Sequence, residues 1–495
     1  MPLVPISSLP ADVAVIDIGS NSIRLVVYEA AGRIFHVRHN EKTMCGLAYG
    51  MDESGGNICE AAIAEARVAI GRYASLCKAR GVDRVIAFAT SALRDAVNAN
   101  EILQWAKDVH GLDVVVLSER EEATYAARGV VQAFDDPRGV VADLGGGSLE
   151  MIDVPGEGAS FSLPVGPLRF VSDGNYAPHK KTELKNVLAK NVPKAWAKGK
   201  TLYLVGGAFR NIAKFHMLRR RYPLHIIHRY DVLPSRLERT LEHLQRASKE
   251  ILSSQPALSK KRAPYLPYVA SLLHMLIDRT TPDRIVFSAA GVREGALFSL
   301  LPEDAGRQTL FEACLDEMRA DFPSEDGGKA LLEWLLPVVA KARAPMRLAA
   351  AACALNGSGD MRDGEFRAEF AYHHTMYSPL PALDHKERVW LTLAVISGYA
   401  SSLTESAELL NNAMEILSDG DKNSAVALGR ALRFARALSG NCASMLARYP
   451  FRYVPEGDAL ELTLPQHDAV FTKMVEKRLQ QLSDVLSCRY SVVRP

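Results

Sequence analysis

Two short turns rich in glycine and serine lie between apolar, β-branched runs, and their residue types suit phosphate chemistry. The first is Asp17-Ile18-Gly19-Ser20-Asn21-Ser22, and the second is Asp143-Leu144-Gly145-Gly146-Gly147-Ser148. Such turns point several backbone N–H groups into one concavity, and small residues let an anion approach the main chain. The first turn alone would also fit an ordinary hairpin, but three consecutive glycines in the second require a bare backbone. The predicted phosphate cradle consists of Asn21, Ser22, Gly145, Gly146, Gly147 and Ser148.

The surrounding sequence repeats around these turns. In both cases an aspartate ends one predicted strand and a second strand leaves the turn, over residues 13–29 and 138–154. The spacing of 126 residues between Asp17 and Asp143 predicts two copies of one α/β domain, each opening with a hairpin and facing the other across a cleft.

Alternating helix and strand patterns fill both predicted copies. The first contains helices expected at 60–80 and 100–109 and strands at 82–90 and 112–117. The second contains strands at 201–205 and 284–288 and a helix that begins near Gly291.

Beyond residue 302 the sequence consists of Ala/Leu-rich segments with a helical pattern. The last part of the chain predicts a strand (459–464), a helix (469–486) and a strand (488–493). The predicted domains are therefore two α/β domains (1–135 and 136–302), a helical domain (303–450) and a small C-terminal β-α-β domain (451–495).

Composition narrows the class of protein. With 495 residues the chain is too long for one hydrophobic core, and 48% hydrophobic with 23% charged residues is ordinary for a globular protein. No run reaches the roughly 18 apolar residues of a membrane helix, and the N-terminus lacks the basic region of a signal peptide. Seven cysteines without a Cys-x-x-Cys pair fit reduced thiols rather than zinc ribbons or disulfide scaffolds. We therefore expect a cytoplasmic protein without a membrane partner.

The net charge of +2 conceals one strongly basic segment. Residues 180–262 hold 20 Lys or Arg but only five acidic residues. This excess predicts either a surface that binds a polyanion or a set of solvated helix faces. The densest clusters, predicted as a polyanion track, are Arg219, Arg220, Arg221, Lys260, Lys261 and Arg262.

Five motifs together resemble one known family. DIGSNSIRL (17–25), TSALRDAVN (90–98), SEREEA (118–123), DLGGGSLE (143–150) and AAGVREGAL (289–297) are similar in order and spacing to motifs of the exopolyphosphatase and guanosine pentaphosphate phosphohydrolase (Ppx/GppA) family. The resemblance covers roughly the first 300 residues. It implies two actin-like (ribonuclease H-like) ATPase-type domains facing across a cleft, followed by a helical HD-like domain, and a homodimer.

The resemblance also implies roles for single residues. Glu121 falls where the family keeps a carboxylate that orients or deprotonates the attacking water, and Arg94 falls where an arginine grips phosphate oxygens. Asp143 and Glu150, which flank the second turn, are the expected ligands of Mg²⁺ or another divalent cation. Gly206 and Gly207 resemble the glycine pair that the family has in its second domain.

The implied activity is hydrolysis of a terminal phosphoanhydride by in-line attack of water, with inorganic polyphosphate as the substrate and no nucleic-acid partner. Guanosine pentaphosphate is the alternative substrate, because the residues do not show which of the two is better. The same fold would also suit a sugar or acetate kinase, or a polyphosphate or guanosine-polyphosphate sensor without turnover. In the helical domain, Asp384 and His385 stand in the reverse of the His-Asp order, so we expect a scaffold there rather than a second metal site.

Overall fold

The computed structural model describes residues 12–31, 34–51, 53–156, 158–171, 178–260, 262–301, 309–320, 328–360, 364–378, 380–400 and 402–494. The chain forms two compact units, 1–310 and 311–495. In the described parts of the chain, no helix is long and apolar enough to cross a membrane.

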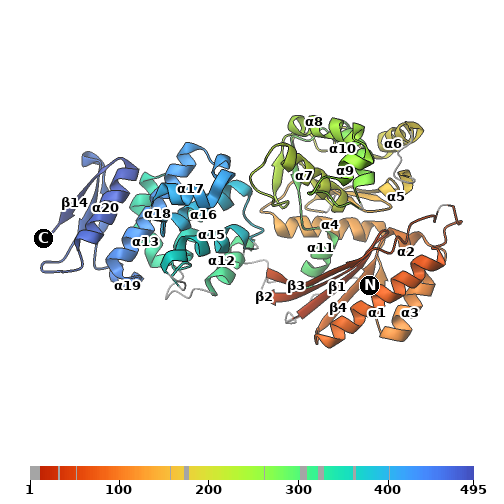
Figure 1. Cartoon of the computed structure of the whole chain (residues 1–495), viewed down its shortest axis with the longest axis horizontal. Coiled ribbons are helices and arrows are strands. Elements are labelled where there is room, and N and C mark those ends of the chain that lie inside the picture. Colours follow the sequence, from red (N-terminus) through yellow and green to blue (C-terminus); the bar gives the residue numbers. More distant parts are fainter. Residues whose placement is uncertain are drawn as a thin grey trace. The chain divides into compact units, whose positions relative to one another are not determined.

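The first unit begins with a five-stranded sheet in the order β3-β2-β1-β4-β5, which with its helices forms lobe I (Figure 1). β1 and β2 form an antiparallel hairpin, β3 extends it, and β4 and β5 run parallel to β1. The buried, β-branched residues of β1 explain its central position. The elements are β1 (Asp12–Ile18), β2 (Ile23–Ala31), β3 (Ile34–Thr43), α1 (Glu60–Ala79), β4 (Arg84–Ala89), α2 (Ser91–Asp95), α3 (Asn100–His110) and β5 (Val114–Val116).

A second sheet, the core of lobe II, repeats this topology. Its order is β10-β11-β9-β6-β7-β8, so that β6, β7 and β8 form an antiparallel meander and β9 and β11 run parallel to β6. The duplication predicted from the spacing of the two turns is thus visible in the strand order. The elements are β6 (Gly139–Leu144), β7 (Leu149–Val154), β8 (Ser160–Leu163), α5 (Pro167–Phe170), α6 (Pro178–Asn191), β9 (Thr201–Val205), α7 (Gly207–Arg219), β10 (Tyr230–Val232), α8 (Pro234–Arg246), α9 (Lys249–Ser253), η1 (Ala263–Tyr265), α10 (Leu266–Thr280) and β11 (Arg284–Phe287).

Two helices cross between the lobes, α4 (Glu119–Ala133) and α11 (Val292–Phe298) (Figure 1). The apolar face of α4 packs on the lobe II sheet, whereas α11 packs on the lobe I sheet. Their close approach requires glycine, because a Cβ at Gly295 would lie 1.8 Å from the carbonyl oxygen of Tyr125. The first turns of both helices are thereby held beside the two glycine-rich turns.

The second unit is helical and ends in a small sheet. Its 21-residue helix α18 packs against α16, α13 and α20. The helices are α12 (Leu310–Ala320), α13 (Lys329–Lys341), α14 (Met346–Ala354), η3 (Gly364–Phe366), α15 (Arg367–Tyr377), α16 (His385–Ser397), α17 (Leu403–Leu410), η4 (Asn411–Ile416), α18 (Asp419–Ser439) and α19 (Ala443–Leu446). Asp384 caps α16 by accepting a hydrogen bond from the Glu387 amide at 2.8 Å.

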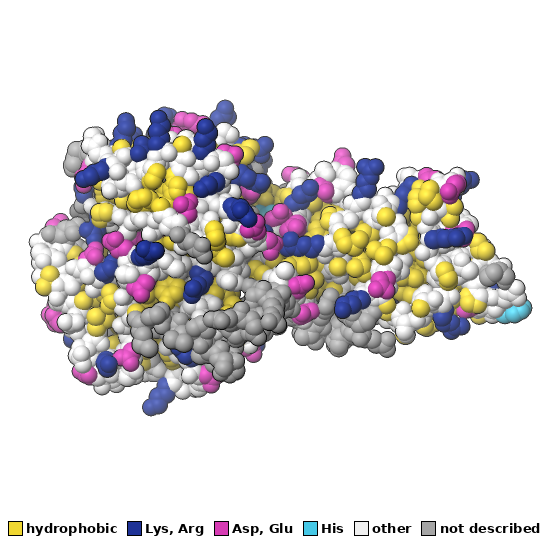
Figure 2. Space-filling model, turned by 180° about the vertical axis from the view of Figure 1, so that it is seen from behind, with side chains coloured by type: hydrophobic (Ala, Val, Ile, Leu, Met, Phe, Trp, Pro, Cys, Tyr) yellow, Lys and Arg dark blue, Asp and Glu magenta, His cyan; other side chains and the backbone are white. Residues whose placement is uncertain are grey.

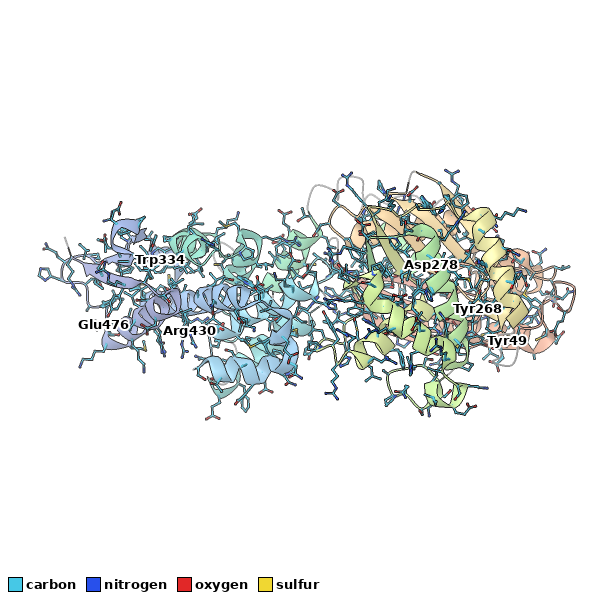
Figure 3. All side chains as sticks on the ribbon, turned by 90° about the horizontal axis from the view of Figure 1, so that it is seen from above. Tyr49, Tyr268, Asp278, Trp334, Arg430 and Glu476 are labelled. Carbon is cyan, nitrogen blue, oxygen red and sulfur yellow. The ribbon has the colours of Figure 1, made fainter. Side chains whose placement is uncertain are left out.

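The C-terminal sheet has the order β12-β13-β14 and is joined to the helices by polar contacts. The indole Nε1 of Trp334 donates to the carbonyl oxygen of Tyr449 at 2.7 Å, and Arg430 donates to the carbonyl oxygen of Ala400 at 2.9 Å (both side chains are labelled in Figure 3). The parallel pair β13 and β14, linked by α20, is the predicted β-α-β unit, and β12 is an additional strand. The elements are β12 (Phe451–Val454), η5 (Pro455–Gly457), β13 (Ala459–Thr463), α20 (Lys473–Leu486) and β14 (Arg489–Val493).

Candidate active site

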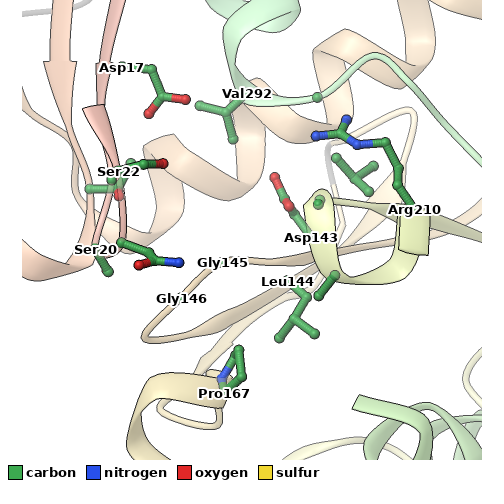
Figure 4. A pocket seen from close by; sticks show the side chains of 18 of the residues that line it. Asp17, Ser20, Ser22, Asp143, Leu144, Gly145, Gly146, Pro167, Arg210 and Val292 are labelled. Carbon is green, nitrogen blue, oxygen red and sulfur yellow. The ribbon is translucent and has the colours of Figure 1, made fainter. Parts of the chain in front are cut away.

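A cavity of about 190 Å³ lies between the lobes where the two glycine-rich turns face each other (Figure 4). We call it the front cavity. Asp17, Ser20 and Ser22 border it from lobe I, and Asp143, Gly145 and Gly146 border it from lobe II. The pair Gly206-Gly207 and the first residues of α11 complete the wall. The cavity thus joins residues that the sequence separates by more than 270 positions.

The two turns share one geometry. The Gly19 amide donates to the carbonyl oxygen of Ser22 at 3.1 Å, and the Gly145 amide donates to that of Ser148 at 3.0 Å. Of the predicted cradle residues, Asn21, Ser22, Gly145 and Gly146 line the front cavity, whereas Gly147 and Ser148 do not. Ser148 is buried, and Gly147 borders a second cavity behind the turn.

Glu121, the base predicted from the sequence, is occupied by capping its own helix. Its Oε2 accepts hydrogen bonds from the Ser118 amide at 2.8 Å and from the Ser118 hydroxyl at 2.7 Å, and these bonds lower the pKa of Glu121. It is not among the residues that line the front cavity. The Ser118-x-x-Glu121 pattern is a capping box, a signal already present in the sequence.

The next residue, Glu122, lies in the cavity where Glu121 was expected. It lines the front cavity, and only 6% of it is exposed. Burial raises the pKa of Glu122 well above that of an ordinary glutamate, although Arg94 opposes this effect. Successive residues of a helix point in directions about 100° apart, so Glu122 faces the cavity while its neighbour Glu121 does not.

Arg94 contacts Glu122 rather than the front cavity. Its Nη1 donates to Glu122 Oε2 at 2.9 Å and to the carbonyl oxygen of Leu117 at 2.9 Å. Arg94 does not line the front cavity. In this structure it therefore positions a carboxylate.

The two residues predicted to hold a cation, Asp143 and Glu150, are cross-strand partners on β6 and β7. Asp143 lines the cavity, and burial raises its pKa to about 6. Glu150 does not line the cavity and is only 1% exposed, and its pKa is raised by burial and then by Glu122. Its Oε1 accepts from the Ser162 hydroxyl at 3.2 Å, while its Oε2 has no hydrogen-bond partner.

The carboxylates of Asp143 and Glu150 are suitable ligands for a hard cation, but they do not form a complete metal site by themselves. Carboxylate oxygens are the ligands that Mg²⁺ prefers, and Oε2 of Glu150, which has no hydrogen-bond partner, could act as such a ligand. Within the described residues, however, no group of three or more His, Cys, Asp or Glu side chains is arranged to hold a metal ion. Further ligands would have to come from substrate oxygens or water.

Among the residues that the structure describes, five cations line the front cavity, and most of them were not singled out from the sequence. They come from both lobes and from α11. Arg24 and Lys42 are cross-strand partners on β2 and β3, and Asp17 on β1 is the other partner of Arg24. The full set is Arg24, Lys42, Arg210, Arg262 and Arg293.

The electrostatics of this cationic wall favour a polyanion. Burial, followed by repulsion from Arg262 and Arg24, lowers the pKa of Lys42 to about 7. The pKa of Arg262 falls to about 10, through burial and then repulsion from neighbouring arginines. Acidic neighbours offset only part of the charge, for Arg293 lies 3.6 Å from Asp17. A bound anion with several charges would relieve this repulsion.

The two clusters of the predicted polyanion track lie in different places. Arg219, Arg220 and Arg221 are exposed at the end of α7 that is remote from the cavity, about 20 Å from its first residue at 1.5 Å rise per residue. Arg262 lines the cavity, Lys260 is exposed, and Lys261 lies outside the described residues. Figure 2 shows many Lys and Arg side chains over lobe II, where Figure 1 places α6, α8 and α10.

The duplicated sheet order and the two facing glycine turns define a two-lobed α/β protein of the actin-like class, with a cationic cavity between its lobes. The predicted fold class is confirmed for the two α/β domains. The exopolyphosphatase of Cytophaga hutchinsonii has a similar fold, with a TM-score of 0.52 and 21% identity over 59% of this chain and 97% of that structure.

The family model of the Ppx/GppA phosphatase family matches residues 25–304, and the chain belongs to this family. Retrograde regulation protein 2 of Saccharomyces cerevisiae is 26% identical over 474 residues, which cover 83% of this chain and 77% of the relative. Exopolyphosphatase 2 of Mycobacterium tuberculosis is 36% identical over 169 residues, which cover 32% of this chain and 53% of the relative. One relative is thus named for regulation and the other for polyphosphate hydrolysis.

Proposed function

We propose that this chain is an exopolyphosphatase that releases the terminal orthophosphate of inorganic polyphosphate. The observation that carries the proposal is the buried carboxylate of Glu122 in a cavity that also holds both glycine-rich turns and five cations. The turns and the cationic wall bind the last phosphates of the chain. Glu122, held by Arg94, accepts a proton from the attacking water.

A divalent cation completes this proposal. Asp143 and Glu150 would hold Mg²⁺ together with substrate oxygens, and the cation would neutralise charge on the phosphates. Substrate position then depends on the two turns and the cationic wall, and proton transfer from water depends on Glu122. We also propose, from the family resemblance, that the chain is a cytoplasmic homodimer.

Guanosine pentaphosphate hydrolysis is the second candidate, because part of the same cavity is apolar. Its apolar border consists of Pro167, Leu168, Leu266 and Val269 beside Tyr265. An aromatic ring and aliphatic side chains would accommodate a purine base. Initial rates of phosphate release from polyphosphate and from guanosine pentaphosphate, each without a phosphate acceptor, separate these substrates and exclude a kinase.

A sensor without turnover is the third candidate, since a relative named for regulation matches most of the chain. The sensor would bind polyphosphate without releasing phosphate. Binding and turnover measured on the same preparation distinguish it from the enzyme. Binding without phosphate release would contradict the proposed hydrolysis.

The fall of kcat/KM on the alkaline side of its pH profile should reflect the deprotonation of Lys42. Because its pKa is lowered to about 7, the amine loses its charge as the pH rises through that value, and attraction for a polyanion weakens. We expect kcat/KM for polyphosphate, which reflects the free enzyme, to fall above about pH 7. Lys42→Arg keeps the charge and should shift this fall to higher pH. Lys78→Arg, an exposed position on α1, is the control, and identical alkaline limbs in all three proteins would exclude Lys42.

The remote basic cluster should matter only for long chains. We expect replacement of Arg219, Arg220 and Arg221 by Ala to weaken long-polyphosphate affinity and to reduce its salt slope by roughly 0.7 per lost contact, as for single-stranded polyanions. Tripolyphosphate should be unaffected because it is too short to span α7.

In contrast, Lys260→Ala with Arg262→Ala should weaken both substrates, since Arg262 lines the cavity. Unchanged long-chain affinity at low and high salt in the Arg219, Arg220 and Arg221 triple variant would show that the charge excess at this cluster is only a solvated surface.

A further inference from the structure

A second cavity, of about 260 Å³, lies behind the second glycine-rich turn, and we call it the rear cavity. Ser20 borders both cavities. Gly145 and Gly146 face the front cavity, whereas Gly147 faces the rear cavity. One strand-connecting turn therefore separates two spaces, one of which is the proposed substrate site.

The partition between the two cavities is thin and polar. The hydroxyl oxygens of Ser20, in the first glycine-rich turn, and of Ser91, the first residue of α2, are 2.8 Å apart. A Cβ at Gly147 would lie 2.9 Å from Ser91 Oγ and 3.4 Å from Ser20 Oγ. The hydroxyl groups of Ser20 and Ser91 and the bare backbone of Gly147 thus lie together where the two cavities approach each other.

An ion pair between the lobes stands at the outer end of the rear cavity. Arg169 Nη2 lies 2.5 Å from Asp95 Oδ2, and the two side chains are 31% and 39% exposed, so this end reaches solvent. Arg169 belongs to α5, whose first turn is hydrogen-bonded to the glycine turn. The Gly166 amide donates to the carbonyl oxygen of Gly147 at 3.0 Å, and the Leu168 amide to that of Gly146 at 3.0 Å.

We propose that the rear cavity is a binding and exit site for orthophosphate, separate from the entrance used by the polyphosphate chain. The proposal rests on the proposed function. After cleavage, the shortened chain still fills the front cavity and blocks that way out for the released phosphate. The Ser20 and Ser91 hydroxyls offer hydrogen bonds along the partition, and Arg169 then exchanges the Asp95 carboxylate for the phosphate dianion. The chain can thereby stay bound through successive cleavages.

The test narrows the rear cavity and compares cleavage with release. Ala48 lines this cavity and is half-buried, so Ala48→Leu places a branched side chain inside it. Ala64→Leu makes the same change at an exposed position on α1 and is the control. Total orthophosphate formed is measured after acid quench, and free orthophosphate is measured with a fluorescent phosphate-binding sensor.

With long polyphosphate, we expect Ala48→Leu to delay free orthophosphate behind total orthophosphate on the order of 10-fold more than Ala64→Leu, because release limits turnover. With tripolyphosphate the delay should be small, since pyrophosphate can leave by the front and let phosphate follow. Polyphosphates of intermediate length should accumulate during the reaction of Ala48→Leu and not during that of Ala64→Leu.

Asp95→Asn is the second variant, because it removes the ion pair with Arg169 at an exposed position with little change in shape. Asp95 Oδ1 also lies 3.9 Å from Nε of Arg94, which holds Glu122, so the rate of total orthophosphate formation after acid quench checks that cleavage itself is unchanged. It should shorten the delay between cleavage and release. Equal delays in wild type, Ala48→Leu and Asp95→Asn would overturn the exit route while leaving hydrolysis intact. A wild-type chain that forms no orthophosphate from polyphosphate would instead contradict the proposed function and the exit route with it.

Discussion

Turnover of polyphosphate by the Glu122→Gln variant is expected to fall by about 100-fold or more, the usual scale of general-base catalysis, while polyphosphate binding persists. Glutamine keeps the shape of the side chain and can still accept the hydrogen bond from Arg94, but it cannot take a proton from water. Binding persists because the cationic wall and both turns are unchanged. Phosphate release and polyphosphate affinity, measured separately, check this result.

Glu121→Gln is the matched control for Glu122→Gln, one position away on the same helix. It replaces the carboxylate that accepts the two Ser118 hydrogen bonds by an amide whose oxygen can still accept them, so we expect only the loss of a negative charge at the helix N-terminus, about 0.3–1 kcal/mol of stability, and near-normal turnover. Reversed results, with turnover lost in Glu121→Gln and kept in Glu122→Gln, would assign the base to Glu121 after all.

The Gly146→Val variant should lose affinity for polyphosphate by roughly 10-fold to 100-fold, since overpacking costs about 1–3 kcal/mol and 1.4 kcal/mol is tenfold. A Cβ at this position would lie 3.0 Å from Ser20 Cβ and 3.0 Å from Leu168 Cδ1, so the larger valine separates the two turns across the front cavity. The dissociation constant of a short polyphosphate and the melting temperature, measured together, report binding and folding separately.

Gly364→Val is the control for Gly146→Val, because a Cβ at Gly364 meets nothing within 4 Å. It should change neither polyphosphate affinity nor melting temperature. If Gly146→Val lowers the melting temperature strongly and binds polyphosphate normally when folded, the glycine serves the fold and not the phosphate.

The fold was largely predictable because each turn lies between buried strands with a strong local pattern. Thr201–Val205 is a strand with the predicted bounds, and α1 and α3 end within one residue of the predicted helices. Ile34–Thr43 was not predicted as a strand, since its mostly half-buried and exposed residues lack clear alternation. Its place in the sheet depends on pairing with β2, which is a tertiary effect.

The candidate site was predictable where the residue type itself indicates the role, as at the glycine-rich turns, and not where neighbouring residues share the same chemistry. The turns could be predicted because three consecutive glycines between apolar strands indicate a backbone that must stay bare. The base could not be chosen in this way, because Glu121 and Glu122 are chemically identical neighbours. Only helix phase and the Ser118 cap separate them, and the capping pattern was available in the sequence. Arg24 and Arg293 lie inside the family motifs, yet their convergence with Lys42 follows from sheet register and from the crossing of α4 and α11.

The most direct test of the central claim is release of orthophosphate from long polyphosphate by the purified chain with Mg²⁺ and without a phosphate acceptor. The proposed function predicts steady orthophosphate release from chain ends that is abolished in Glu122→Gln and retained in Glu121→Gln. Polyphosphate that binds but stays intact in the wild-type protein would contradict it and would leave a phosphate-binding regulatory protein on the same fold.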